Sequence, residues 1–193
     1  MADATPRYSL SEMKPRDPIL GFRGSYRWMS NFWRVPGLTA YGIPCPTVEH
    51  AYVIAKIAPD RSDRMALARE IASLPSPADA KRRGRRIELR PDWEDVKGDM
   101  MATLLARKFA PGTAMSEKLS ATGRRPIFEL NTWGDVEWGV IALADGDTLK
   151  GRNLMGRLLE TRRAALMNEP EQLRKDESLE EDVAAAVEDV PGP

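Results

Sequence analysis

Helical patterns outnumber strand patterns along this chain, and this balance predicts a mainly α, α+β fold. Well-marked helix starts at Thr47 and at Ser76-Pro77 support the prediction, as does a long amphipathic segment that opens at Pro91. Strand-like residues occur only in short runs near glycine or proline. At 193 residues the chain is long enough to bury one hydrophobic core, so we expect a single domain with terminal extensions.

The N-terminal part predicts an extension, two short strands and an aromatic loop. Residues 1–18 are polar and contain three prolines, so we expect a loosely held extension. Residues 19–23 and 38–41 predict strands, because apolar residues there are bounded by glycine. Between them, residues 24–33 mix aromatic side chains with Ser and Asn. Such a loop suits a site that stacks on a flat ligand, or an aromatic cluster that closes the core.

The helix predicted at residues 47–56 has an unusual polar content. Thr47 is a good N-cap, because its hydroxyl can accept a hydrogen bond from a backbone N–H of the first turn, and Pro46 prevents an earlier start. One face is apolar, whereas the next carries Glu49 and Lys56. One interpretation is a first-turn glutamate favoured by the helix dipole and a solvated lysine. The other is a functional carboxylate with a cation nearby.

Two helices follow, and the second is strongly basic. Residues 60–72 predict a short amphipathic helix, and Ser76-Pro77 begins the next one. Helical spacing spreads its positive charges over more than one face, so we expect only one or two of them to contact a ligand. A nucleic-acid-binding module is an alternative function that rests on this helix alone. The positive residues in and after the helix are Lys81, Arg82, Arg83, Arg85, Arg86 and Arg90.

The C-terminal half predicts more helices and a second aromatic loop. Trp93 and Lys97 lie on one flank of the helix that opens at Pro91. Residues 133–139 contain tryptophan and acidic residues close together, and an apolar run follows them. The expected elements are helices over 92–109, 113–121 and 154–166, and a strand over 126–130.

Composition restricts the chemistry. The single cysteine, Cys45, excludes an internal disulfide framework, and with the single histidine, His50, it argues against a zinc site. We therefore expect neither metal nor cofactor, and acid–base work done mainly by carboxylates. No signal peptide or long apolar run is visible, so we expect a cytoplasmic protein, in its native or a host cell, without membrane contact.

The zero net charge conceals an asymmetry along the chain. Residues 168–193 hold nine acidic and two basic residues, which leaves 20 acidic and 27 basic residues in the preceding 167. We expect residues 168–193 to be a flexible acidic tail. A basic body suggests an anionic ligand, and the tail then either screens the body or keeps the protein soluble.

Several short motifs occur in a specific order between residues 19 and 166. They are Phe22-Arg23-Gly24, Ser30-Asn31-Phe32, Pro46-Thr47-Val48-Glu49-His50-Ala51-Tyr52 with Lys56, Ser76-Pro77 with Lys81 and Arg85, Arg90-Pro91-Asp92-Trp93 with Lys97, Glu129, Trp138-Gly139, and Gly151-Arg152-Asn153 with Gly156. In this order they resemble the NADAR (NAD and ADP-ribose) superfamily of YbiA-like N-glycosidases. The resemblance implies one multi-helical domain over residues 19–167 with a small peripheral β-sheet.

The resemblance also implies an activity, the hydrolysis of an N-glycosidic bond in an ADP-ribose-type or ribosyl-phosphate substrate. Examples are ADP-ribosylated guanine, free or in nucleic acid, and ribosylamino-pyrimidine phosphates of the riboflavin pathway. Cleavage at ribose C1′ builds positive charge on the sugar, which a carboxylate can stabilise while it activates water. The alternative is a non-catalytic module that binds NAD-derived nucleotides.

Site residues follow from the resemblance one position at a time. Glu49 matches the catalytic carboxylate. Trp93 and Trp138 either sandwich the base or pack in the core. The residues expected in the catalytic site are Glu49, Lys56, Trp93 and Trp138, and those expected to bind substrate are Arg23, Asn31, Phe32, Lys97, Asn153 and Arg85.

Overall fold

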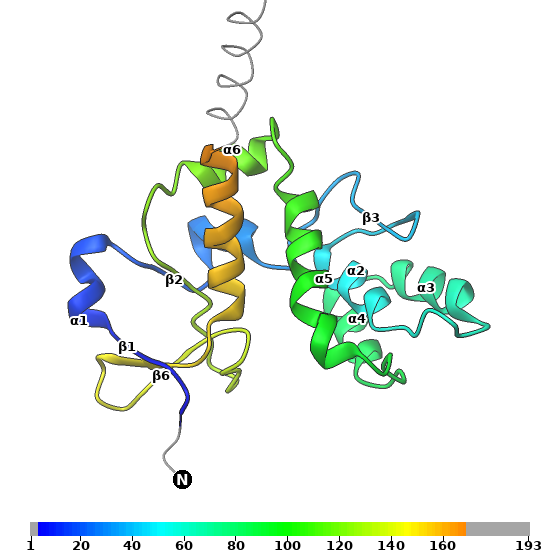
Figure 1. The fold of residues 1–193 in the computed structure, drawn as a ribbon, viewed down its shortest axis with the longest axis horizontal. Coiled ribbons are helices and arrows are strands. Elements are labelled where there is room, and N and C mark those ends of the chain that lie inside the picture. The colour runs from blue at the N-terminus through cyan, green and yellow to red at the C-terminus, as the bar shows by residue number, and fades with distance from the viewer. Residues whose placement is uncertain (1–3, 169–193) are drawn as a thin grey trace, which may run out of the picture.

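Helices account for much more of the structure than strands do, as the sequence predicts, and three of them gather on one side of the molecule (Figure 1). The computed structural model describes residues 4–168. The long helix over 93–108 and a C-terminal helix form the middle of the molecule. Most of the short strands lie beyond them on the opposite side, whereas one short hairpin lies beside the three gathered helices. The described helices are α1 (Leu10–Met13), α2 (Val48–Ala55), α3 (Arg64–Ala72), α4 (Pro77–Gly84), α5 (Trp93–Lys108), α6 (Ala114–Ser120), the 3₁₀ helices η1 (Lys14–Arg16) and η2 (Gly24–Met29), and the C-terminal helix over 154–168.

The strands are two or three residues long and form three small sheets. The largest has the order β1-β7-β6 with antiparallel neighbours, β2 pairs with β5 in parallel, and β3 pairs with β4 as a hairpin. Their bounds are β1 (Arg7–Ser9), β2 (Ile19–Leu20), β3 (Thr39–Ala40), β4 (Ile43–Pro44), β5 (Ile127–Phe128), β6 (Ile141–Ala142) and β7 (Thr148–Lys150).

The N-terminal segment corrects one expectation. We expected a loosely held extension, but β1 pairs with β7, and α1 follows it directly. The Tyr8 ring packs edge-on against Phe128, with 5.0 Å between the ring centroids, and Met13 is buried beside them. A strand from the far end of the chain supplies hydrogen bonds that the local sequence does not reveal, so residues 7–16 belong to the folded body.

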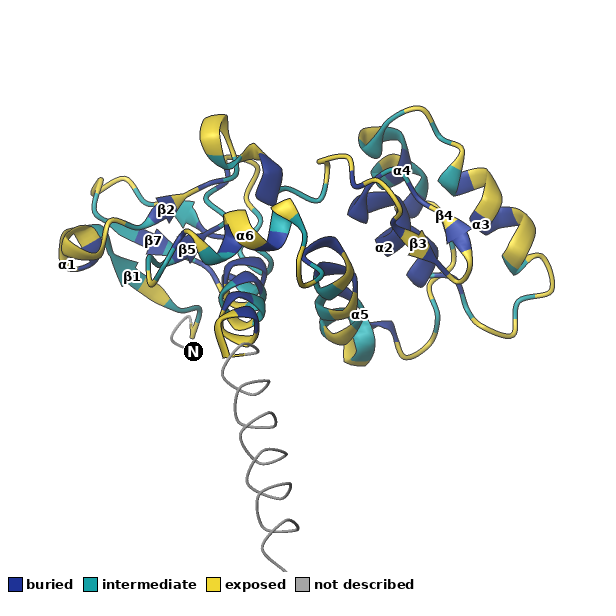
Figure 2. Ribbon diagram, turned by 90° about the horizontal axis from the view of Figure 1, so that it is seen from above, coloured by how far each residue is buried: buried dark blue, intermediate teal, exposed yellow. Residues whose placement is uncertain are grey.

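Helix α2 lies at the centre of the larger core, and all eight of its residues are buried (Figure 2). It starts as predicted, because the Thr47 hydroxyl accepts a hydrogen bond from the backbone N–H of His50. The His50 ring also contacts the Thr47 hydroxyl, at 2.8 Å, and the carbonyl of Leu74. These bonds satisfy the polar ring atoms of His50 that burial removes from water.

Helix α4 approaches α2 closely because its last residue is Gly84. A Cβ at that position would lie 2.9 Å from a methyl carbon of Val53, which is itself fully buried. The Ser76 hydroxyl caps α4 by accepting a hydrogen bond from the N–H of Asp79, as the sequence predicts. The close contact brings the basic residues of α4 alongside α2.

The C-terminal helix packs against β5 in a similar way. A Cβ at Gly156 would lie only 2.1 Å from the carbonyl oxygen of Ile127, so only glycine fits there. Asn153, just before the helix, donates from Nδ2 to the Ile127 carbonyl and accepts at Oδ1 from the N–H of Glu129. Asn153 thereby fixes the backbone at Ile127 and at Glu129.

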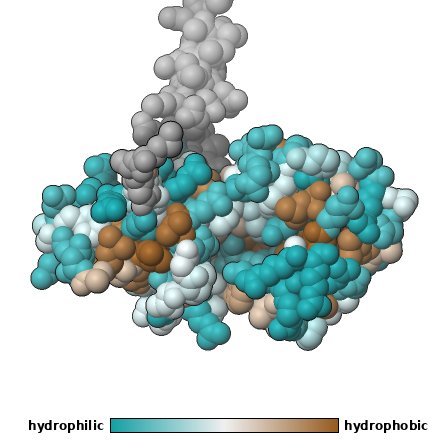
Figure 3. Space-filling model, turned by 90° about the horizontal axis from the view of Figure 1, so that it is seen from below, coloured by the Kyte–Doolittle hydropathy of each residue, from teal (hydrophilic) through white to brown (hydrophobic). Residues whose placement is uncertain are grey.

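The surface of the described part is predominantly polar where Figure 3 shows it, with hydrophobic residues gathered in separate patches. Residues 4–168 contain no helix that combines the length and apolar character needed to cross a membrane.

Candidate active site

One cavity of about 480 Å³ collects polar and aromatic side chains from α2, α4, α5, the C-terminal helix and two loops. Its volume falls in the range of small-molecule sites, roughly 300–1,000 Å³. It is lined by Ser30, Asn31, Phe32, Glu49, Tyr52, Lys56, Lys81, Arg85, Met101, Glu129, Trp133, Asp135, Trp138 and Met155.

Glu49 contributes a nearly buried carboxyl group to this cavity. It lies in the first turn of α2, and its residue is 9% exposed. Its backbone N–H donates to the carbonyl of Asn31 at 3.1 Å, which ties the loop after η2 to the start of α2. Burial raises the pKa of Glu49, and the charges of Lys81, Lys56 and Arg85 oppose that rise. The cavity therefore holds a carboxyl group faced by three cations.

Glu129 is a second carboxyl group in the same cavity. It directly follows β5. Its pKa is raised to about 7, mainly by burial and also by the negative charges of Asp135 and Glu49, against the effect of Lys81. At neutral pH a large share of Glu129 is thus protonated and able to donate a hydrogen. The described residues contain no group of three or more His, Cys, Asp or Glu side chains that could hold a metal ion.

The cations come from the ends of two helices. Lys56 is the C-cap of α2, Lys81 lies within α4, and Arg85 is the C-cap of α4. Burial lowers the pKa of Lys56, although Glu49 works in the opposite direction. Arg82 and Arg83 are occupied elsewhere, by ion pairs with Asp79 and Glu70. Of the basic run, Lys81 and Arg85 line the cavity.

Asn31 presents an unused acceptor. Its Nδ2 lies 3.6 Å from the Met101 sulfur, but its Oδ1 is buried and has no hydrogen-bond partner within residues 4–168. An unsatisfied buried polar atom costs about 1–3 kcal/mol. Buried Lys108 supports the same loop, because its Nζ donates to the carbonyls of Met29 and Ser30 at 3.1 and 2.7 Å. The loop is thus held in a position that leaves the Asn31 Oδ1 without a partner among residues 4–168.

The aromatic residues divide into a packed group and an exposed group. The Tyr52 ring packs against Trp93 on one side and against Trp138 on the other, with centroid distances of 5.0 and 5.6 Å. Trp93 is 6% exposed, whereas Phe32 and Trp133 are 41% and 62% exposed. The most exposed rings at the cavity are therefore Phe32 and Trp133, while Trp138 is half-buried.

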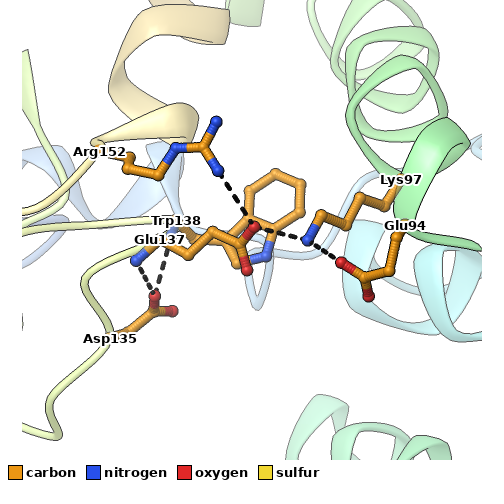
Figure 4. A network of polar contacts seen from close by, with 6 residues as sticks. All are labelled: Glu94, Lys97, Asp135, Glu137, Trp138 and Arg152. Atoms are coloured by element: carbon orange, nitrogen blue, oxygen red, sulfur yellow. Dashed lines mark hydrogen bonds and ion pairs between the residues drawn. The ribbon is translucent and has the colours of Figure 1, made fainter. Parts of the chain in front are cut away.

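A polar network holds the loop that carries Trp138 (Figure 4). Asp135 accepts hydrogen bonds from the backbone N–H groups of Glu137 and Trp138, at 3.0 and 2.9 Å. The Lys97 ammonium bridges Glu137 to Glu94 of α5, with both N–O distances at 2.5 Å. These contacts raise the pKa of Lys97 despite its partial burial. The network connects the loop to α5, and so fixes one wall of the cavity.

Six of the ten residues expected from sequence line the cavity, and four do not. Arg23 lines a neighbouring cavity of about 400 Å³. Trp93 is buried behind Tyr52 and Lys56, with the Lys56 Nζ 5.5 Å from its ring centroid. Lys97 is engaged by two glutamates, and Asn153 bonds to backbone groups around β5. The six that line the cavity are Glu49, Lys56, Trp138, Asn31, Phe32 and Arg85.

The structure adds residues to which sequence reasoning gave no role. Glu129 had a signal, since an acid inside the otherwise apolar strand-like run 126–130 is unusual. Tyr52 is an aromatic residue within a helix pattern, and Lys81 is one of several cations in a run. Trp133 stands in the same loop as Trp138, and only the fold shows which of the two rings is exposed.

Comparison with known proteins identifies relatives of this chain. The N-glycosidase YbiA of Escherichia coli is 32% identical over 149 residues, which span 75% of this chain and 86% of that protein. Its solved structure superposes with a TM-score of 0.61 and covers 80% of this chain and 88% of its own. A riboflavin biosynthesis protein of Vibrio vulnificus is 28% identical over 137 residues, only 34% of its length. The profile of the NADAR domain matches residues 16–167, and the chain belongs to the NADAR domain family.

Proposed function

We propose that this protein is an N-glycosidase that hydrolyses the bond between ribose C1′ and a nitrogen atom of an ADP-ribose-type or ribosyl-phosphate substrate. The observation that carries the proposal is the pair of carboxyl groups, buried Glu49 and half-buried Glu129, in one cavity with three cations. The similarity to proteins named N-glycosidase YbiA supports the reaction class.

The two carboxyl groups suit the two halves of the reaction. As the C1′–N bond breaks, positive charge develops on the ribose, and the Glu49 carboxylate stabilises it and accepts a proton from the attacking water. The departing nitrogen takes a proton from Glu129, whose pKa of about 7 leaves it partly protonated at neutral pH. A C1′–O bond replaces the C1′–N bond, and each glutamate changes by one proton.

The remaining polar groups suit a ribosyl phosphate. The unpaired Oδ1 of Asn31 accepts a hydrogen bond from a ribose hydroxyl or a base N–H. Lys81 and Arg85, at one side of the cavity, bind phosphate oxygens. Because Arg82 and Arg83 are engaged in ion pairs, the positive charge available for phosphate is concentrated at the cavity. This favours a nucleotide-sized anion as the group recognised, whether it is free or attached to nucleic acid.

The test is a substrate panel followed by mass spectrometry of the released products. The panel contains an oligonucleotide with ADP-ribosylated guanine, ADP-ribose, NAD and ribosylamino-pyrimidine phosphates. We expect Glu49→Gln to lower kcat by about 100-fold or more on the substrate that is cleaved, while its affinity is retained. Glu88→Gln is the matched control, since the Glu88 side chain is 87% exposed and lies outside the cavity.

Two outcomes would contradict the proposal. Full turnover by Glu49→Gln would remove that carboxylate from the reaction. Tight binding of a panel compound by the unchanged protein, with no product after long incubation, would instead identify a module that sequesters nucleotides.

A further inference from the structure

Trp133 is the most exposed of the large hydrophobic side chains within residues 4–168, and it lies on the wall of the candidate active site. Its residue is 62% exposed, while the next most exposed of these, Met167, is 48% exposed. It lines the same cavity as Glu49 and Glu129. An exposed indole ring on the wall of a polar cavity offers an aromatic face to a ligand bound there.

The exposure of this ring is built into the loop. Asn131, 2% exposed, accepts at Oδ1 from the N–H groups of Trp133 and Asp135, at 3.3 and 3.0 Å. Its Nδ2 donates to the carbonyls of Asp135 and Val140, at 2.7 and 3.0 Å. Gly134 takes a φ of +86°, which lets the chain turn sharply directly after Trp133. These hydrogen bonds and the turn at Gly134 fix the backbone of the loop that carries the exposed Trp133 ring.

Lys81 accompanies the ring. Its Nζ is 5.9 Å from the ring centroid of Trp133, and Lys81 also lines the cavity. Phe32, 41% exposed, is the other open ring of the cavity. In contrast, Trp138 and Trp93 are already packed against Tyr52, so their faces are less available to a ligand.

We infer that Trp133 is a specificity-determining residue, which stacks on the flat heterocyclic base that the substrate carries on ribose C1′. The inference rests on the proposed function and deepens it, because it separates recognition of the base from recognition of the sugar phosphate. Trp133 selects aromatic leaving groups, while the cations and Asn31 hold the ribosyl phosphate. Stacking on an aromatic side chain is tolerant of base identity, since every base has a π-face.

The binding test uses two probes that share a sugar phosphate, guanosine 5′-monophosphate and ribose 5-phosphate, measured by calorimetry on the whole protein. We expect Trp133→Ala to weaken the nucleotide by roughly tenfold and leave ribose 5-phosphate within about twofold. Trp133→Phe keeps an aromatic face and restores most of the affinity. Trp33→Ala is the matched control, because Trp33 is 40% exposed but does not line the cavity.

Kinetics on a cleaved substrate give a second readout. Trp133→Ala raises KM by roughly tenfold with little change in kcat, whereas a general distortion of the site would lower kcat as well. The binding arm needs no turnover, so it separates this inference from the hydrolysis itself. Equal affinity of the unchanged protein for the two probes, or an equal loss of both in Trp133→Ala, would overturn the role of Trp133.

Discussion

Glu49 and Glu129 share a cavity but differ in the charges around them. Burial raises the pKa of both, yet three cations oppose the rise at Glu49, whereas Asp135 and Glu49 add to it at Glu129. Two carboxyl groups in different charge environments can divide the work of base and acid. In the proposed reaction Glu49 acts in its ionised form and Glu129 in its protonated form.

The pH dependence of hydrolysis tests this division at the residue scale. Glu129, with its pKa raised from 4.5 to about 7, loses its proton as the pH rises through that value. A proton donor must be protonated, so we expect kcat to fall above about pH 7, by roughly tenfold for each further pH unit. Glu129→Gln has no acidic proton, so it lowers kcat by about 100-fold or more and abolishes this alkaline decline.

The measurement is a pH–rate profile from about pH 5 to about pH 9 on the substrate that the panel identifies. Glu88→Gln, altered on the surface, should keep both the rate and the alkaline decline of the unchanged protein. An identical decline in Glu129→Gln would assign that titration to a different group and leave the leaving nitrogen without an identified donor.

Whether a side chain could be predicted to line the site depended on how far along the chain its contacting residues lie. Glu49 follows from a capped helix start and from its motif, and it lines the cavity. Lys97 and Asn153 have equally suitable chemistry, but their partners come from segments 40 and 24 residues away. A polar residue that is engaged within the fold cannot be distinguished in sequence from one that is free to bind substrate.

At the scale of elements, the contact between α2 and α4 sets the distance between the carboxylate of α2 and the cations of α4. Gly84→Ala places a methyl group 2.9 Å from Val53, a buried β-branched residue that cannot turn aside. We expect a loss of about 1–3 kcal/mol in the free energy of unfolding, reduced by up to about 1 kcal/mol because alanine favours helix. The added methyl group also moves α4, with its cations Lys81 and Arg85, away from α2. We therefore expect the KM for a phosphate-bearing substrate to rise as well.

Denaturant unfolding and steady-state kinetics check that expectation. A suitable control is Gly98→Ala in α5, because a Cβ at that position meets nothing within 4 Å. Alanine favours helix more than glycine does, so the free energy of unfolding of this control should be unchanged or higher. Gly84→Ala with unchanged stability and unchanged KM would show that α4 does not need this close approach.

Elements were predictable where the signal is local. The caps of α2 and α4 rest on hydrogen bonds within one turn, and both starts were predicted correctly. The strands β1 and β7 are each three residues long and lie more than 130 residues apart in the sequence, so no local sequence pattern predicts them. Only their pairing makes them strands, and this is why the N-terminal segment was expected to be loosely held.

At the scale of the whole molecule, the N-terminal segment closes a second, smaller core. Its buried members are Met13, Phe128, Val140 and Leu149, with Tyr8 packed against them. Phe128 is the last residue of β5 and directly precedes Glu129. A segment outside the family match of residues 16–167 therefore covers the strand that presents a candidate catalytic carboxyl group.

Removal of residues 1–13 tests this coupling. The deletion exposes Phe128 and Leu149 and breaks the pairing of β1 with β7. We therefore expect the free energy of unfolding to fall by several kcal/mol, at roughly 1.5–3 kcal/mol per large side chain uncovered.

Point variants of Tyr8 test the same contact more gently. Tyr8→Ala lowers the free energy of unfolding by less than the deletion does, and Tyr8→Phe, which keeps the ring against Phe128, stays close to the unchanged protein. If β5 transmits the effect, Tyr8→Ala also lowers kcat under conditions where the protein remains folded, as circular dichroism would show. Unchanged stability and activity after the deletion would mean that the smaller core closes without its N-terminal strand, and that Glu129 is positioned by Asn153 and the C-terminal helix alone.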